Sequence, residues 1–358
     1  MSDQGAPDRA RLRAGSRPSP TDSYYGMPAL KPSHYAWPIA GYFFVGGLAS
    51  AAQFIATVLD LVGGREDRPA VRAGRYLAFL GALASPPLLI VDLETPRRWY
   101  NMLRIFRPTS TMSIGSWALT AFGAFSGLVA MGQAAEDLLG WVAGRWLARV
   151  FSLPAALAGG VVALYTGTLL AATNLPLWAG SFPFLSSLFA SSATSTATAA
   201  LTLVTDGPGA PQNTRRRLSW LALIAGAAEL FFAALIEHDW RRRQVAAPIE
   251  GRQLGPAWHF GVLGLGIAAP LVVHVLEVLV GRTSRRASAL AALATLAGGF
   301  ILRAVLIFGG KASTRRPEDY LRMTGDGGQQ TAESRRPTAD GRQQTEQASD
   351  FWLLTTDF

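Results

Sequence analysis

The sequence predicts an all-α integral membrane protein, a bundle of about eight transmembrane helices with polar, largely disordered segments at both ends. Of the 358 residues, 49% are hydrophobic and only 16% are charged. The charged residues cluster between long apolar stretches. A bilayer core of about 30 Å is crossed by roughly 20 apolar residues in a helix. The stretches lack period-two alternation and are rich in Ala, Leu and Gly, which excludes transmembrane strands.

Eight stretches of the required length are expected to be the transmembrane helices. They cover residues 36–62, 74–93, 112–132, 148–173, 181–204, 216–237, 258–280 and 287–309. Small residues, such as Gly298-Gly299 and the Ser/Thr/Ala run at 190–202, are typical of helices that approach closely in a membrane. Three regions follow from this pattern: a polar lead-in over 1–33, the bundle over 34–310, and a polar tail over 311–358.

The net charge of +9 comes from arginines in the expected loops and tails. There they meet lipid headgroups or partner proteins, so we do not expect nucleic-acid binding. The chain has no cysteine, which excludes a cysteine-ligated iron–sulfur cluster of its own. A two-haem cytochrome needs four axial histidines in facing helices. Of the four histidines, only His274 lies deep in an expected helix, so we expect neither haem nor a metal site.

With eight helices, both chain ends lie on one side of the membrane, here called the A side; the opposite side is the B side. Most of the unusual polar chemistry falls on the A side. Asp92 closes the second expected helix and is followed by Arg97 and Arg98. Asp92 is a candidate proton acceptor, or alternatively an ion-pair partner of Arg97 or Arg98. The B-side loops read as ordinary Arg/Glu/Gly connectors.

Ionisable residues inside a membrane are costly and are candidates for function. Glu229 and Arg303 lie at comparable depths in two expected helices and would form a buried structural pair. Alternatively, Glu229, His274 and Glu277 are steps of a proton path between the two faces.

Several motifs lie in order along the bundle. They are Tyr42–Leu48, Asp92-Leu93 with Arg97-Arg98-Trp99, Asn101–Arg104 with Arg107–Ser110 and Met112–Trp117, Tyr165-Thr166-Gly167 with Pro176-Leu177-Trp178, and Gly298-Gly299-Phe300 with Arg303 and Gly309. Over residues 24–310 the chain resembles the NrfD/polysulfide-reductase membrane-subunit family. That resemblance implies a haem-free bundle that binds quinol or menaquinone on one face. It also implies a four-cluster ferredoxin-like iron–sulfur subunit as partner, and through it a molybdopterin or cytochrome subunit.

The resemblance also implies roles for single residues. Tyr165 matches a family tyrosine that contacts the quinone. A family histidine and asparagine match Tyr42 and Ile39, and His34 is a possible substitute. The expected quinone contacts are therefore Tyr165, Tyr42 and His34. Asp92 would take protons, Arg303 would neutralise a buried carboxylate such as Glu229, and Arg97, Arg98, Arg107 and Trp178 would dock the partner.

The chain has no redox centre of its own, so the resemblance makes it a subunit of a respiratory oxidoreductase rather than a complete enzyme. It would exchange electrons between the quinone pool and the iron–sulfur partner, as a multi-pass protein of the cytoplasmic membrane. The alternative is a haem-free membrane anchor, or a small-molecule or proton transporter without quinone chemistry.

Overall fold

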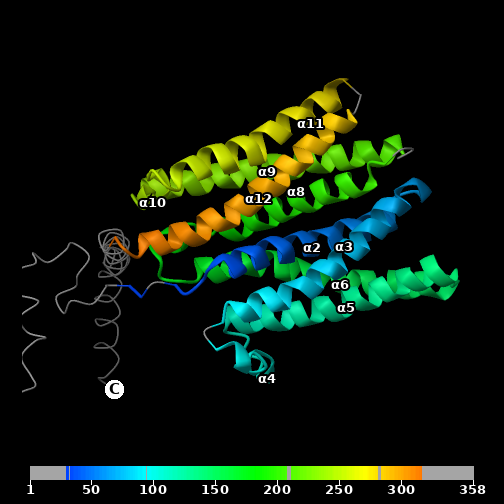
Figure 1. Ribbon diagram of the computed structural model, residues 1–358, viewed down its shortest axis with the longest axis horizontal. Helices are drawn as coiled ribbons and strands as arrows, with labels where there is room; N and C mark the ends of the chain where they lie inside the picture. The colour runs from blue at the N-terminus through cyan, green and yellow to red at the C-terminus, as the bar shows by residue number, and fades with distance from the viewer. Residues whose placement is uncertain (1–29, 32, 94, 208–210, 281–283, 317–358) are drawn as a thin grey trace, which may run out of the picture.

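The computed structural model describes residues 30, 31, 33–93, 95–207, 211–280 and 284–316. Within these residues the chain is helical and has no strand. The long helices, shown in Figure 1, are α2 (Trp37–Val62), α3 (Arg68–Val91), α5 (Thr111–Leu139), α6 (Val142–Ala171), α8 (Leu185–Thr205), α9 (Gln212–Arg242), the π-helix η3 (Ala257–Ala268) continued by α11 (Ala269–Val280), and α12 (Arg285–Ser313). The predicted polar segments lie outside the described residues, apart from the few residues that precede α2 and residues 311–316, of which the first three belong to α12.

Short helices connect the long ones. They are η1 (Arg65–Asp67), η2 (Pro96–Arg98), α4 (Asn101–Arg104), α7 (Pro176–Ala179) and α10 (Ala247–Glu250). Several long helices extend beyond the predicted apolar stretches, as α9 does at both ends. The reason is that an apolar stretch marks the hydrocarbon core, whereas backbone hydrogen bonding continues into the charged turns beyond it.

The helix α8 departs from the simple hydropathy pattern. Among the described residues, seven helical spans are long and apolar enough to cross a membrane. The helix α8 is also long, but it is not one of these seven. Its Ser and Thr hydroxyls, such as those of Thr198 and Thr202, donate to backbone carbonyls one turn earlier. It packs against α2, α6, α9 and α12. A helix so enclosed has little lipid contact and needs no apolar surface all round.

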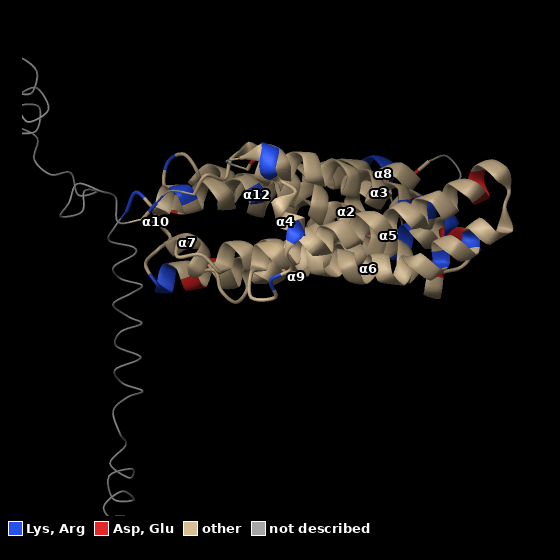
Figure 2. Cartoon of the chain, turned by 90° about the horizontal axis from the view of Figure 1, so that it is seen from below, with Lys and Arg blue, Asp and Glu red and all other residues tan. Residues whose placement is uncertain are grey.

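The long helices form two neighbouring groups of four. One contains α2, α3, α5 and α6, and the other contains α8, α9, η3/α11 and α12 (Figure 1). The groups meet where α2 and α6 pack on α8, and where α12 packs on α2. The start of α2 and the end of α12 lie at the same end of the bundle, as predicted for the A side. Most charged residues lie toward the two ends (Figure 2).

Three fully buried tryptophans hold the A-side connections together. Trp178 in α7 donates its indole N–H to the carbonyl of Leu306, 2.7 Å away. Trp240 donates to the carbonyl of Leu177 at 2.9 Å, and Trp258 donates to Glu237 at 3.1 Å. The prediction that Trp178 forms part of a docking surface is therefore wrong. Gly310 faces its ring so closely that an added Cβ would lie 2.1 Å from the ring carbon Cε2, so the tryptophan fits between helices instead of facing outward.

Candidate functional site

A small pocket lies at the A side of the first helix group, where the start of α2 meets the A-side ends of α3, α5 and α6. Its volume is about 20 Å³, which is room for about one water molecule. Four residues of the lining can donate or accept hydrogen bonds through a phenol, imidazole or carboxylate group: His34, Tyr35, Asp92 and Tyr165. The lining consists of His34, Tyr35, Ile39, Leu89, Asp92, Leu93, Met112, Ser116, Tyr165 and Leu169.

Tyr165 is a buried polar residue of this pocket. Its hydroxyl is hydrogen-bonded to the hydroxyl of Tyr42, which is fully buried and lies behind Tyr165, outside the pocket lining. The ring of Tyr165 packs directly on Gly115 of α5, where an added Cβ would lie 2.0 Å from the ring carbon Cε2. A glycine is therefore required at this position. Tyr42 holds Tyr165 in place, whereas the sequence predicted that Tyr42 itself contacts a quinone.

Asp92 ends α3 and faces the start of α2. Its Oδ1 accepts a hydrogen bond from the backbone N–H of Ala36, the residue that precedes α2, at 3.0 Å. Burial raises the pKa of Asp92 above its usual range, although the Ala36 N–H and the nearby charges of His34 and Lys311 oppose this rise. The alternative ion pair with Arg97 or Arg98 does not form among the described residues, and both arginines are exposed.

Two residues just before α2 complete the polar lining. His34 is exposed and forms the mouth of the pocket, and its ring lies edge-on to that of Tyr35, with 4.8 Å between centroids. Tyr35 is buried, and burial together with the charge of Asp92 raises its pKa. The sequence singled out His34 but not Tyr35. Its adjacency to His34 was the only signal, because an isolated aromatic before a helix is common at a membrane interface.

A second small cavity lies within the other helix group. Its volume is about 20 Å³, and both Glu229 of α9 and His274 of α11 line it. His274 Nδ1 lies 3.2 Å from a carboxylate oxygen of Glu277. Glu277 also accepts hydrogen bonds from Ser219, at 3.0 Å, and from Ser288. Of the three residues of the predicted proton path, Glu229 and His274 line this cavity, and Glu277 contacts His274 without lining it.

Arg303 is fully buried and faces this cluster from α12. Its guanidinium donates to Ser192 and to the carbonyl of Gly299 at 3.0 Å, and it lies 5.3 Å from the ring centroid of Phe189. It interacts electrostatically with Glu229. The described residues contain no direct ion pair between the two. The predicted pairing of Arg303 with Glu229 is therefore a longer-range attraction, with Ser192 as the direct contact of Arg303.

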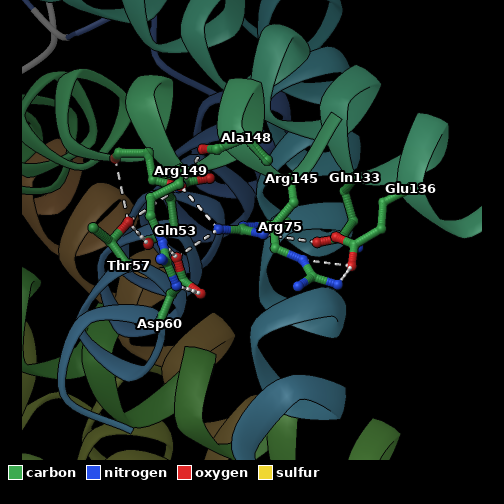
Figure 3. A network of polar contacts seen from close by, with 10 residues as sticks. Gln53, Thr57, Asp60, Arg75, Gln133, Glu136, Arg145, Ala148 and Arg149 are labelled. Atoms are coloured by element: carbon green, nitrogen blue, oxygen red, sulfur yellow. Dashed lines mark hydrogen bonds and ion pairs between the residues drawn. The ribbon is translucent and has the colours of Figure 1, made fainter. Parts of the chain in front are cut away.

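A third polar cluster lies at the B side of the first helix group (Figure 3). Arg75 of α3 is 2% exposed and donates to Gln133 at 2.8 Å and to Asp60 at 3.1 Å. Arg149 of α6 donates to the same carboxylate at 3.0 Å. The predicted helix over 74–93 includes Arg75 close to its start, and the sequence did not single this residue out as buried. The residue lies two turns inside α3, and the helix extends further toward its N-terminus than the apolar stretch indicates.

The predicted docking arginines Arg97, Arg98 and Arg107 are all exposed, on or beside the connection that contains η2 and α4. The same connection exposes large apolar side chains. These are Trp99, Tyr100, Ile105 and Phe106, each between 43% and 57% exposed.

Comparisons with known proteins agree with this architecture. The family model described as Polysulphide reductase, NrfD matches residues 29–314, which contain every long helix that the structure describes. The sequence is 27% identical over 298 residues to the C chain of polysulfide reductase from Wolinella succinogenes, an alignment that covers 77% of this protein and 93% of that one. The protein is therefore a multi-pass membrane protein that belongs to the polysulphide reductase NrfD family.

Proposed function

We propose that this protein is the quinol-binding membrane subunit of a respiratory oxidoreductase, and that it passes electrons between membrane quinone and an iron–sulfur partner subunit. The observation that carries the proposal is the A-side pocket, where Tyr165, His34 and Asp92 meet although they lie far apart in the sequence. Family membership and the similarity to a protein named as part of polysulfide reductase support the same function.

The pocket offers the groups that quinol oxidation needs. Oxidation of a quinol releases two protons and two electrons, so the site must hold the ring oxygens and accept protons. Tyr42 can donate to the hydroxyl oxygen of Tyr165, which leaves the Tyr165 proton for a ring oxygen of the ligand. Asp92 accepts a proton, and the exposed His34 passes protons to water. The electrons leave through the A side to the partner's cluster.

A quinone ring is larger than the pocket in its present state. Entry therefore requires side chains to move, and Met112 is the candidate because it is partly exposed and its thioether group is flexible. The rest of the polar lining is anchored: Tyr165 by Tyr42 and Gly115, and Asp92 by the Ala36 N–H. Movement at one wall would thus leave the polar contacts in place.

The partner surface is proposed to be the exposed connection with Arg97, Arg98 and Arg107. Its mixture of arginines and aromatic side chains is typical of protein interfaces. It joins α3, which carries Asp92, to α5, which carries Gly115 and Ser116. A partner bound there would lie close to the pocket, as electron transfer requires.

A proton path is a second proposed function, and the cavity shared by Glu229 and His274 favours it. The cavity has room for a water molecule between polar groups, and Glu277 continues the series of contacts toward Ser219 and Ser288. Arg303 would stabilise the ionised form of Glu229 without closing the cavity.

The quinol site is tested by measuring how a fluorescent quinol-analogue inhibitor binds to the purified protein. Quenching of the inhibitor's fluorescence reports its binding. We expect one saturable site in the wild type, and roughly 3- to 10-fold weaker binding in Tyr165→Phe, which loses one hydrogen bond to the ligand. The matched control is Tyr76→Phe, which loses a 2.8 Å hydrogen bond to Asp137 at the B side and should bind normally. Equal binding by Tyr165→Phe and wild type would remove Tyr165 from the site.

A further inference from the structure

An apolar groove of about 310 Å³ lies between α3 and α5, with the connection of η2 and α4 at its A-side end. Its volume is within the range of roughly 300–1,000 Å³ typical of ligand sites. The walls are formed almost wholly by carbon atoms of aliphatic and aromatic side chains. Gly123 of α5 leaves a gap in one wall, since an added Cβ there would meet no atom within 4 Å.

The groove adjoins the polar pocket. Leu89 of α3 and Ser116 of α5 line both of them, so the two spaces lie next to each other. The hydroxyl of Ser116 lies 2.8 Å from the carbonyl oxygen of Met112 in its own helix and 3.9 Å from the sulfur of Met102, and it can donate to either. Leu89 is apolar and partly buried. A molecule with a polar ring and an apolar tail could occupy both spaces at once.

The direction of the groove follows one face of α3. The residues of α3 that line it recur at helical spacing: Phe79, Ala82, Leu83, Pro86, Leu89 and Ile90. The first and last are eleven residues apart, which at a rise of 1.5 Å per residue is roughly 17 Å along the helix. The groove therefore runs from the A-side pocket toward the middle of the bilayer.

The groove is open to lipid along its side. Leu83 is 62% exposed and Trp99 is 43% exposed, although both line it. Pro86 lies in the same wall and has no backbone N–H, so the α3 ladder lacks one hydrogen bond at this level. A long apolar tail can therefore enter sideways from the bilayer, without passing through water.

We infer that this groove binds the isoprenoid tail of the membrane quinone and guides the ring into the polar pocket. This inference rests on the proposed function. The tail is the occupant that the groove fits: it is apolar like the lining, it must leave the pocket toward the bilayer, and the groove takes that direction. A polar ring in the groove would leave its oxygens without hydrogen bonds.

The experiment compares two ligands on the full-length protein in lipid nanodiscs: the tailless quinol-analogue inhibitor, and the same headgroup with several isoprene units. The variant Gly123→Leu fills the groove from a position with open space. The control Gly160→Leu makes the same change at a partly buried glycine of α6 that also has open space and does not line the groove. Ala124→Phe, from an exposed position in the same groove, is a second filling variant.

In the wild type we expect the tailed ligand to bind about tenfold more tightly than the tailless one. Both filling variants should lose most of this advantage and bind the tailless inhibitor within about twofold of the wild type. Gly160→Leu should keep it. A tailed-ligand advantage that survives in both filling variants overturns the inference. The inference is also overturned if the filling variants keep the tailed-ligand advantage and lose only a co-purified phospholipid, because a phospholipid acyl chain then occupies the groove.

The failure of the proposed function would look different. In that case the tailless inhibitor would not bind the wild-type protein at all, or would bind Tyr165→Phe as tightly as the wild type. Both the proposed ring site and the proposed tail site would then be rejected. Loss of the tail advantage alone, with tailless binding intact, concerns only the groove.

Discussion

Asp92 ends one helix and caps the next, and this double contact determines its chemistry. The hydrogen bond to the Ala36 N–H orients the carboxylate and fixes α3 to the start of α2. Burial raises the pKa of Asp92, so it binds a proton at a higher pH than an ordinary aspartate does. A proton acceptor works best when its pKa approaches the working pH. The same contacts that hold the pocket together would therefore suit Asp92 to its proposed role of accepting a proton from a quinol.

Asp92→Asn keeps an oxygen acceptor for the Ala36 N–H but cannot take a proton. We expect quinol oxidation by the native complex to fall by about 100-fold, the lower end of what general base catalysis contributes. In the wild type the rate should rise with pH through the pKa of Asp92, because only the ionised carboxylate accepts a proton. That pKa lies above about 3.9, the value of an ordinary aspartate. The variant should lack this dependence.

The measurement is the pH profile of the oxidation rate, with inhibitor binding as the control for an intact pocket. If Asp92→Asn retains both the rate and the dependence on Asp92 ionisation, another group accepts the proton. Asp92 is then only the cap of α2.

At the scale of elements, α3 connects the two ends of the first helix group. Its last turn leads to Asp92 in the pocket, and its second turn carries Arg75 in the B-side network. Arg75 contacts Asp60 of α2 and Gln133 of α5, and Arg149 of α6 shares the Asp60 carboxylate (Figure 3). One buried arginine thereby connects the four helices that form the A-side pocket at their other end.

Arg75→Met should therefore destabilise the bundle. Removing one partner of a buried ion pair typically costs about 3–5 kcal/mol, and the remaining Arg149 contact with Asp60 keeps the expected loss near the lower end. The matched control is Arg72→Met, one turn earlier in α3, where a 56% exposed arginine pairs with Asp137 and the expected cost is about 0–1 kcal/mol. Denaturant titration in detergent measures both, and similar losses in the two variants would contradict a special role for Arg75.

How far the sequence predicts the elements depends on what makes each residue stand out. Tyr165, His34 and Asp92 lie at the A-side ends of apolar stretches, where a polar residue is conspicuous, and the structure places them in one pocket. Trp178 was misread because an aromatic residue beside a loop is equally compatible with an exposed interface and with packing between helices. The contact with Gly310, more than 130 residues away, decided it.

Arg75 was not singled out for a related reason. An arginine near the edge of an apolar stretch normally reaches the membrane surface, and its burial depends on Asp60 and Gln133 in other helices. The Ser/Thr-rich α8 shows the opposite case. Its sequence is only weakly apolar, yet its place was predicted from the length of the stretch and its run of small residues, and its hydroxyls bond within the helix. Hydrogen-bond partners that lie within one helix can be predicted from the sequence, whereas partners on other helices cannot.

At the scale of the whole molecule, the two candidate sites occupy different helix groups. The A-side pocket is formed by residues of the first group and the segment before α2, and the cavity of Glu229 and His274 lies within the second. The groups meet near Arg303, whose guanidinium reaches toward Gly47 of α2, where an added Cβ would lie 3.7 Å from a nitrogen of Arg303. Redox chemistry and proton movement are therefore proposed to be separate in space.

Glu229→Gln tests this separation. It keeps the size of the side chain but removes the titratable group, so proton movement across a liposome membrane during turnover should fall strongly. Inhibitor binding at the A-side pocket should be unchanged. A pH-sensitive dye inside the liposomes measures the first and fluorescence quenching the second, with Glu66→Gln, an exposed B-side residue, as the control. Normal proton movement in Glu229→Gln would contradict the path.

The central claim is the location of the quinone ring, and photolabelling tests it most directly. The native membrane protein is illuminated with an azidoquinone, and the labelled residues are mapped by mass spectrometry with and without excess inhibitor. We predict inhibitor-sensitive labels on the pocket lining, such as Ile39, Met112 and Leu169. Inhibitor-sensitive labels confined to the second helix group, with none on α2, α5 or α6, would contradict the claim.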